Sequence, residues 1–231
     1  MEARVVRDRT YSVVGKDGFL LIVGAALLLT TGLALLASGC TPEGVPREAF
    51  RAELTPLNTV LTGLETTGTV NLSVTAESLH VAVEVQNAPA DMMHLIHYHG
   101  FVDGRGAVCP TPEVDVNGDG IIDLIETHAV SGRTMVPFHD DPATLQIQAG
   151  SYPTADAEGN LSYQRSVALA DLAESLREQW GVDSLQFAKR VVYLHGVDPE
   201  RALPETVQSL EGVDPHITLP IACGKLVLVG P

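Results

Sequence analysis

Three of the chain's eight histidines stand within six residues, in the stretch HLIHYHGFVDG at positions 94–104. Alternate residues of a β-strand project from the same face, so His97 and His99 would lie side by side while His94 points elsewhere. Two imidazoles at that spacing can share one transition-metal ion. The same pattern fits two surface or core histidines, so spacing alone leaves metal binding and a structural pair both open.

The sequence DVNGDGIIDLIE at 115–126 places oxygen ligands at the positions of an EF-hand calcium loop. Gly120 allows the sharp turn, whereas Pro110 and Pro112 exclude a helix that enters the loop. We therefore predict a structural calcium clip and not a calcium switch, with a solvated acidic loop as the alternative. Its ligands would be Asp115, Asn117, Asp119, the backbone carbonyl of Ile121, Asp123 and Glu126.

The N-terminal segment predicts a location outside the cytoplasm. Residues 19–37 are an almost unbroken apolar run behind four basic residues, and the run is long enough to span a bilayer. It ends in LLASGC, which resembles a bacterial lipoprotein signal, although Ala37 stands where that signal prefers Leu. We predict a signal peptide at 1–39 and a lipidated Cys40 that anchors the protein in the bacterial cell envelope, on the periplasmic or cell-surface side. An uncleaved membrane anchor is the alternative, and it leaves the remaining chain outside the cytoplasm too.

Cysteine usage and charge bear on the same compartment. Cys109 and Cys223 are one pair available for a disulfide in an oxidising space, or else two unrelated free thiols. The formal net charge is −15, and it becomes −16 when residues 1–39, with four basic and three acidic residues, are removed. So acidic a chain is unsuited to binding nucleic acid. We expect no nucleic-acid partner.

The remaining sequence predicts an all-β domain over residues 67–231. A proline-containing stretch at 40–66 has no clear period and is interpreted as a tether. Residues 79–85 alternate between apolar and other side chains, and short β-rich runs recur at 189–197 and 222–230, which favours a sandwich or barrel. One amphipathic helix is predicted over 166–181, with Ser166 as its cap.

Three motifs resemble the copper/zinc superoxide dismutase family. HLIHYHGFVDG is similar to that family's LHGFHVHEFGD, RVVYLHG to its late strand that ends in a copper-binding histidine, and LPIACGKLVLVG to its C-terminal R-L-A-C-G-V-I-G. The resemblance implies a Greek-key β-sandwich into which the calcium-like loop and the helix are inserted. It implies copper ligands at His97, His99 and His195, and a disulfide between Cys109 and Cys223. It also implies that His94 holds the site together without touching the metal.

The chain departs from this family at three places. The histidine that bridges copper and zinc has no clear counterpart, with His128 as the candidate and His139 as a weaker one. No zinc-binding cluster of two further histidines and an aspartate follows, so we do not expect zinc. The family's superoxide-guiding arginine is replaced by Pro220, and Arg133 or Arg105 are the remaining candidates for that role.

The sequence therefore leaves two functions open. The first is a copper-only enzyme that disproportionates superoxide at His97, His99 and His195, with His128 as a candidate fourth ligand. The second is a non-catalytic module on the cell surface that binds copper or is only stabilised by calcium. The chain has no G-x-S-x-G motif and no glycine-rich phosphate loop, which disfavours other catalytic classes. Copper binding in some form is a stronger expectation than the disproportionation of superoxide.

Overall fold

The structure is a computed structural model that describes residues 44–148 and 150–230. The predicted signal peptide at 1–39 and the lipidation site Cys40 lie outside the described residues. Within the described ranges, no helix combines the length and apolar character needed to cross a membrane.

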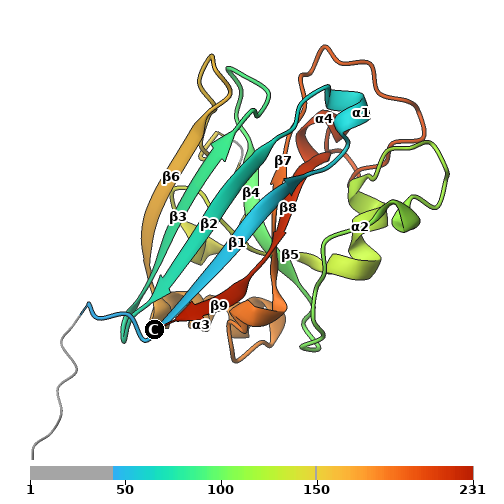
Figure 1. The fold of residues 1–231 in the computed structure, drawn as a ribbon. Coiled ribbons are helices and arrows are strands. Elements are labelled where there is room, and N and C mark those ends of the chain that lie inside the picture. The colour runs from blue at the N-terminus through green and yellow to red at the C-terminus, as the bar shows by residue number, and fades with distance from the viewer. Residues whose placement is uncertain (1–43, 149, 231) are drawn as a thin grey trace, which may run out of the picture. The chain divides into compact units, whose positions relative to one another are not determined.

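The described chain is mostly β-structure with short helices (Figure 1). In chain order the elements, with 3-10 helices marked η, are β1 (Glu48–Pro56), α1 (Thr59–Thr62), β2 (Thr67–Val74), β3 (Ser78–Gln86), β4 (Leu95–Gly100), η1 (Pro112–Val114), α2 (Leu124–Ser131), β5 (Arg133–Pro137), η2 (Pro142–Thr144), β6 (Leu161–Ala168), α3 (Leu169–Trp180), η3 (Phe187–Lys189), β7 (Val191–His195), α4 (Pro215–Thr218), β8 (Pro220–Lys225) and β9 (Val227–Gly230).

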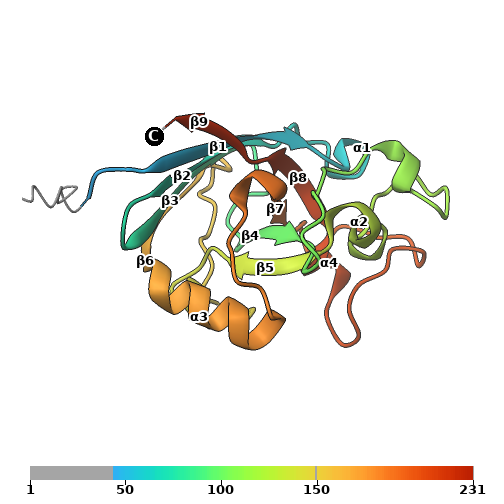
Figure 2. The same cartoon turned by 90° about the horizontal axis from the view of Figure 1, so that it is seen from below.

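The strands form one antiparallel sheet that curls into a half-barrel (Figure 2). Its order is β5-β4-β7-β8-β1-β2-β3-β6, and β9 pairs with β1 outside this path. β1 joins the two halves of the sheet, β5-β4-β7-β8 and β2-β3-β6. It pairs with β2 along most of its length and with β8 only through Thr55 and Pro56. Antiparallel pairing between strands distant in sequence, such as β4 with β7, brings together residues about one hundred positions apart.

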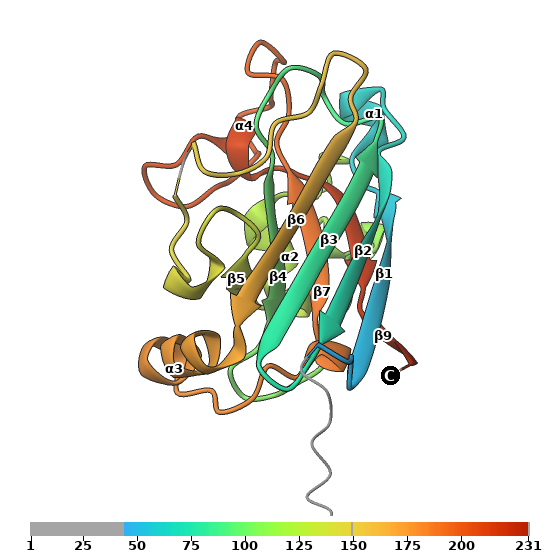
Figure 3. The same ribbon diagram turned by 90° about the vertical axis from the view of Figure 1, so that its left-hand side faces the viewer.

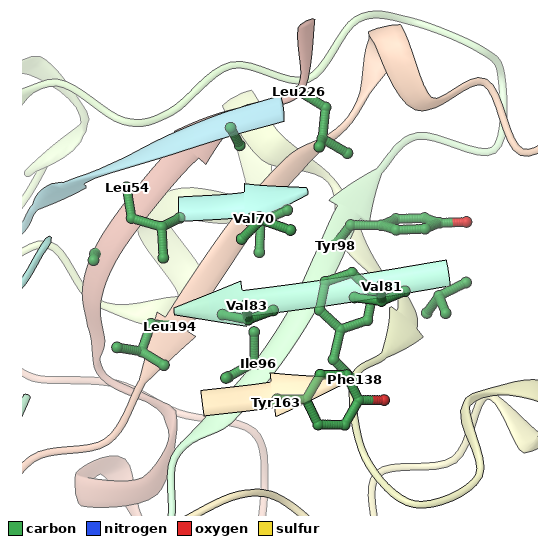
Figure 4. Close-up of a cluster of buried hydrophobic side chains, with 14 of the residues drawn as sticks. Leu54, Val70, Val81, Val83, Ile96, Tyr98, Phe138, Tyr163, Leu194 and Leu226 are labelled. Carbon is green, nitrogen blue, oxygen red and sulfur yellow. The ribbon is translucent and has the colours of Figure 1, made fainter. Parts of the chain in front are cut away.

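The core lies inside the curl and follows the alternation along the strands. Leu79, Val81, Val83 and Val85 of β3 are buried, while His80 and Glu84 between them are exposed. This confirms the alternation predicted for residues 79–85. Figure 4 shows Val81 and Val83 facing residues of the opposite half, which include Ile96 of β4 and Leu194 of β7.

The tether predicted for residues 40–66 does not extend that far. Residues 48–56 form β1 in the middle of the sheet, and residues 59–62 form α1. Phe50, Ala52 and Leu54 are buried and alternate with the exposed Arg51 and Glu53. The prediction was wrong here because prolines are typical of linkers, whereas Pro56 stands at the end of β1 and does not interrupt the strand.

The predicted amphipathic helix is present as α3, but it begins three residues later than expected. Ser166 is not its cap: it belongs to β6 and pairs with His80 of β3. Leu172 and Leu176 of α3 are buried in the core, and the helix ends at Gly181 in the left-handed conformation. α3 packs against β6 and η2, at the end of the sheet where β6 finishes (Figure 3).

A disulfide joins Cys109, in the loop after β4, to Cys223 of β8. Their Cα atoms are 5.8 Å apart and their separation in sequence is 114 residues. The pairing agrees with the one that the family resemblance implied. The bond is consistent with an extracytoplasmic location, because disulfides persist in oxidising compartments.

Candidate metal centre

Strands β4 and β7 bring three imidazoles together on the face of the sheet opposite the core. Ile96 and Tyr98 of β4 point into the core, so His97 and His99 point to the other face. β7 is antiparallel to β4, with His97 opposite Tyr193 and Leu95 opposite His195. The resulting three-histidine group comprises His97, His99 and His195, whose ligand atoms all lie within 4.8 Å of one another.

The histidine rings are stacked and almost completely excluded from solvent. The His97 ring centroid lies 4.8 Å from that of His99 and 4.7 Å from that of His195. All three side chains are 3% exposed or less. Both ring nitrogens of His97 and Nε2 of His195 have no hydrogen-bond partner within the described structure. Buried polar atoms nearly always have a partner. A neutral imidazole has one nitrogen with a lone pair, so one nitrogen of His97 and Nε2 of His195 fit a group that accepts lone pairs, such as a metal ion.

Backbone carbonyls orient two of the three rings. His195 Nδ1 lies 2.6 Å from the carbonyl oxygen of Thr218, and His99 Nδ1 lies 3.3 Å from that of Gly132. A carbonyl oxygen only accepts hydrogen bonds, so each Nδ1 carries the proton and each Nε2 keeps its lone pair. The two Nε2 atoms are therefore the nitrogens through which His99 and His195 could bind a metal ion. Thr134 Oγ1 lies 3.3 Å from Nε2 of His99.

His94 contacts the backbone of β7 at the residue that contributes one imidazole to the three-histidine group, His195. It is completely buried, and its Nδ1 and Nε2 lie 3.0 and 2.9 Å from the carbonyl oxygens of His195 and Pro89. Gly196, which follows the ligand strand, leaves space for this ring. A Cβ atom there would lie 3.1 Å from His94 Nδ1, on a backbone with φ of +117°. The glycine of the LHG motif thus allows the close approach of His94 to β7.

Burial keeps the three-histidine group uncharged. Desolvation lowers the pKa of His97 well below its ordinary value, with further lowering from His195 and His99. Desolvation also lowers the pKa of His99 to about 3 and the pKa of His195 to about 4. At neutral pH all three rings are therefore neutral, which is the form that binds metal ions.

The two other candidate histidines lie outside this group. Within residues 44–148 and 150–230, the three-histidine group is the one set of at least three His, Cys, Asp or Glu side chains whose ligand atoms converge. His128 is exposed on α2, although its charge contributes to lowering the pKa of His99. His139 is buried, but Nε2 meets the carbonyl oxygen of Gln146 at 2.7 Å and Nδ1 accepts the amide of Asp141. The predicted bridging role of either residue is not supported.

The calcium-like loop is tightly folded, but its oxygens contact backbone amides. Asp115 accepts hydrogen bonds from the amides of Gly118 and Gly120, and Asp119 Oδ1 accepts one from Ile121. Asp123 and Glu126 form a capping box at the start of α2. The remaining predicted ligand, Asn117, accepts the amide of Asp119. Nothing in the structure supports calcium itself, so that part stays a prediction.

Several residues around the centre carried no expectation from the sequence. The Tyr193 ring lies 4.7 Å from the ring of His99, and its hydroxyl is 2.6 Å from Oγ of Ser131. Tyr193 stands two residues before His195 on the same strand, so the strand period alone places both side chains on one face. Thr134, Gly132 and Thr218 had no comparable signal, because their contacts depend on strand pairing and loop conformation.

Pro220 and the two candidates for a guiding arginine, Arg105 and Arg133, have different surroundings. Pro220 pairs with His195 in the sheet, so it lies beside the group as the resemblance implied. The Arg105 guanidinium stacks on Phe101 at 3.8 Å and pairs with Asp103. Arg133 lines a cleft that also contains His99. Of the two arginines, Arg133 is therefore the one that shares a cleft with a member of the three-histidine group.

No protein-family model matches the chain, and no curated protein matches its sequence. The antiparallel half-barrel, the buried three-histidine group and the disulfide are compatible with a fold like that of copper/zinc superoxide dismutases.

Proposed function

We propose that the protein binds one copper ion at His97, His99 and His195, on a scaffold of the copper/zinc superoxide dismutase type. The observation that carries the proposal is the convergence of three buried, neutral imidazoles, two of which, His97 and His195, have ring nitrogens without a hydrogen-bond partner within the described structure. Imidazole ligands suit copper, whose affinity for a nitrogen site exceeds that of the other common divalent metals. Copper, when bound, would supply one-electron redox chemistry.

The strand order supports the Greek-key part of this proposal. β1, β2 and β3 are successive neighbours, and β8 returns to lie beside β1. Three consecutive strands with a distant fourth beside the first are the pattern of a Greek key. On the other side, β6 lies beside β3 although β4 and β5 intervene in sequence. Copper/zinc superoxide dismutase shares this class of sandwich architecture.

Metal analysis of the full chain tests the proposal. We expect one copper per chain by mass spectrometry after loading, with the electron paramagnetic resonance signature of nitrogen ligands. His97→Ala and His195→Ala should each lose that stoichiometry. His80→Ala is the matched control, because His80 is an exposed histidine on β3 whose Nδ1 lies 2.6 Å from Oγ of Ser166. Copper that binds equally to the wild type and to His97→Ala would contradict the assignment.

A second candidate function is the disproportionation of superoxide at the copper. Arg133 favours it, since a cation in the cleft that contains His99 would attract an anion. Superoxide consumption by the copper-loaded chain, measured with the same variants, separates an enzyme from a copper-binding module. Turnover that disappears in His195→Ala identifies the enzyme, whereas bound copper without turnover identifies the module.

The calcium clip and the lipid anchor complete the proposal. Calcium at residues 115–126 should raise the unfolding temperature of the wild type and leave that of Glu126→Gln unchanged, and an equal response of both would contradict the site.

Lipid labelling and membrane fractionation test the anchor. Cys40→Ser should abolish the label, whereas the apolar run at 19–37, which then stays uncleaved, should keep the chain in the membrane fraction.

A further inference from the structure

A cleft of about 710 Å³ opens beside the three-histidine group. Its lining comes from β4, α2, β5, the end of α3 and loop residues, and includes His99 of β4 and Thr134 of β5. The volume is in the range of sites for small organic molecules. Copper binding at the three-histidine group does not by itself require a cleft of this size or composition.

The charge of the cleft is opposite to that of the whole chain. Acidic residues outnumber Lys and Arg by 15 in the sequence, yet none of the described residues that line the cleft is Asp or Glu. Arg133 is the one Lys or Arg among these lining residues, and His99 and His128 are the other titratable groups. A cation without a neighbouring carboxylate favours an anionic ligand.

The guanidinium of Arg133 is held in place without being neutralised. It lies over the ring of Trp180 at 4.0 Å from the ring centroid. In the part of the chain that the structure describes, Arg133 forms no ion pair, whereas Arg51, Arg105 and Arg165 each pair with an acidic side chain. Stacking occupies the face of a guanidinium and leaves its N–H edge available for two parallel hydrogen bonds to a carboxylate.

Large apolar side chains surround the same cleft. Ile125, Ile147 and Leu210 line it from three separate segments, and between 43% and 57% of each remains exposed. Trp180 lies among them and packs partly against the core. Apolar side chains that gather around one opening mark a binding surface more often than side chains scattered singly do.

We propose that this cleft binds a small organic anion, a carboxylate with an apolar body. The carboxylate pairs with Arg133, and the apolar body covers Trp180, Ile147 and Leu210. The ligand would lie against the wall that contains His99, and so beside the three-histidine group. The site consists only of this chain's own residues and requires no metal, so it stands or falls independently of copper binding.

Fluorescence of the metal-free full chain in a mild detergent tests the proposal directly, because Trp180 is the only tryptophan in the sequence. Titration with hexanoate should change the Trp180 emission to saturation. Hexanamide, which has the same apolar body without charge, and acetate, which has the charge without the body, should each bind at least about tenfold more weakly. Calorimetry of the same titrations provides a second readout.

Variants separate the charge from the apolar surface. Arg133→Gln should reduce hexanoate affinity about tenfold and abolish the preference over hexanamide, while Arg133→Lys retains part of both. Ile147→Ser should weaken hexanoate and hexanamide alike. Arg51→Gln, on β1, is the matched control and should bind as the wild type does. Equal binding of hexanoate and hexanamide by the wild type, or unchanged hexanoate affinity in Arg133→Gln, would overturn the proposal.

Discussion

At the scale of single residues, the three-histidine group is held ready for a metal by burial. Desolvation disfavours the charged form of each ring and so lowers its pKa, which makes protonation less favourable than for an imidazole in water. Protons therefore compete weakly with a metal ion for the same nitrogens. A bound metal ion should therefore be lost only at a lower pH than from a site made of exposed histidines.

Copper should remain bound at a pH where a surface histidine site has released it. The pKa values of His99 and His195 lie at about 3 and about 4, below the ordinary value of 6.5. We expect the spectrum of the copper-loaded protein to be unchanged on acidification to about pH 5. Titration of the visible absorption checks this. Half-release of copper near pH 6.5 would show that the rings are as accessible to protons as exposed ones.

His216 provides the opposite pH dependence, this time in stability. Its pKa is raised by the hydrogen bond to the Arg201 carbonyl and by Asp214, although partial burial opposes the shift. Because the folded pKa exceeds the unfolded value, the contribution is fully present below about pH 6.5 and is lost as pH rises through the folded value. In His216→Asn, the loss of unfolding free energy should be about 0.5 kcal/mol larger at acid pH than at alkaline pH.

Chemical denaturation of both proteins at about pH 5.5 and about pH 8.5 measures this difference. The buried histidines whose pKa values are lowered affect wild type and variant equally, so their contribution cancels. The carbonyl of His216 accepts the amide of Val197, two residues after His195. This bond joins the segment that contains His216 to the loop that follows β7. A larger loss at alkaline pH would contradict the assigned direction.

At the scale of elements, some placements follow from local sequence and others do not. The period of two predicted the buried face of β3 and the shared face of His97 and His99, because each depends only on residues within one strand. β1 was missed, since its short alternation lies between prolines. The position of His195 opposite β4 depends on pairing across about one hundred residues, which no local pattern encodes. Only the family resemblance indicated it.

Gly132 shows how such a non-local contact fixes the site. Its φ is +74°, and a Cβ atom would lie 2.2 Å from the carbonyl oxygen of Gly100. Gly132→Ala must therefore shift β5 away from β4, together with the carbonyl that orients His99. We expect a loss of roughly 1–3 kcal/mol in stability and an altered copper spectrum. Denaturation and electron paramagnetic resonance measure the two effects.

Gly181→Ala is the control for this substitution. Gly181 also has a positive φ, of +65°, but nothing lies within 4 Å of its added Cβ atom. It should cost about 1 kcal/mol through the backbone alone and leave the copper spectrum unchanged. A spectrum altered equally in both variants would mean that the close approach of Gly132 to Gly100 does not orient His99.

At the scale of the whole molecule, the three-histidine group and the disulfide lie on neighbouring strands. Tyr193, two residues before His195 on β7, pairs with Cys223 of β8 in the sheet. The other half of the disulfide, Cys109, belongs to the loop that follows β4. The disulfide therefore joins β8, the neighbour of β7, to the loop that follows β4. Its loss should affect global stability more than the site itself.

Replacing both cysteines by serine should lower the unfolding free energy by about 2–5 kcal/mol, because the bond closes a long loop in the unfolded chain. Copper stoichiometry should persist under folding conditions, since β4 and β7 pair directly through five residues and do not depend on Cys109 for their register. Urea denaturation without reductant measures the first effect, and metal analysis of the same sample measures the second. A double variant that remains as stable as the wild type but loses copper would reverse the expectation, and would show that the loop after β4 holds the ligands in place.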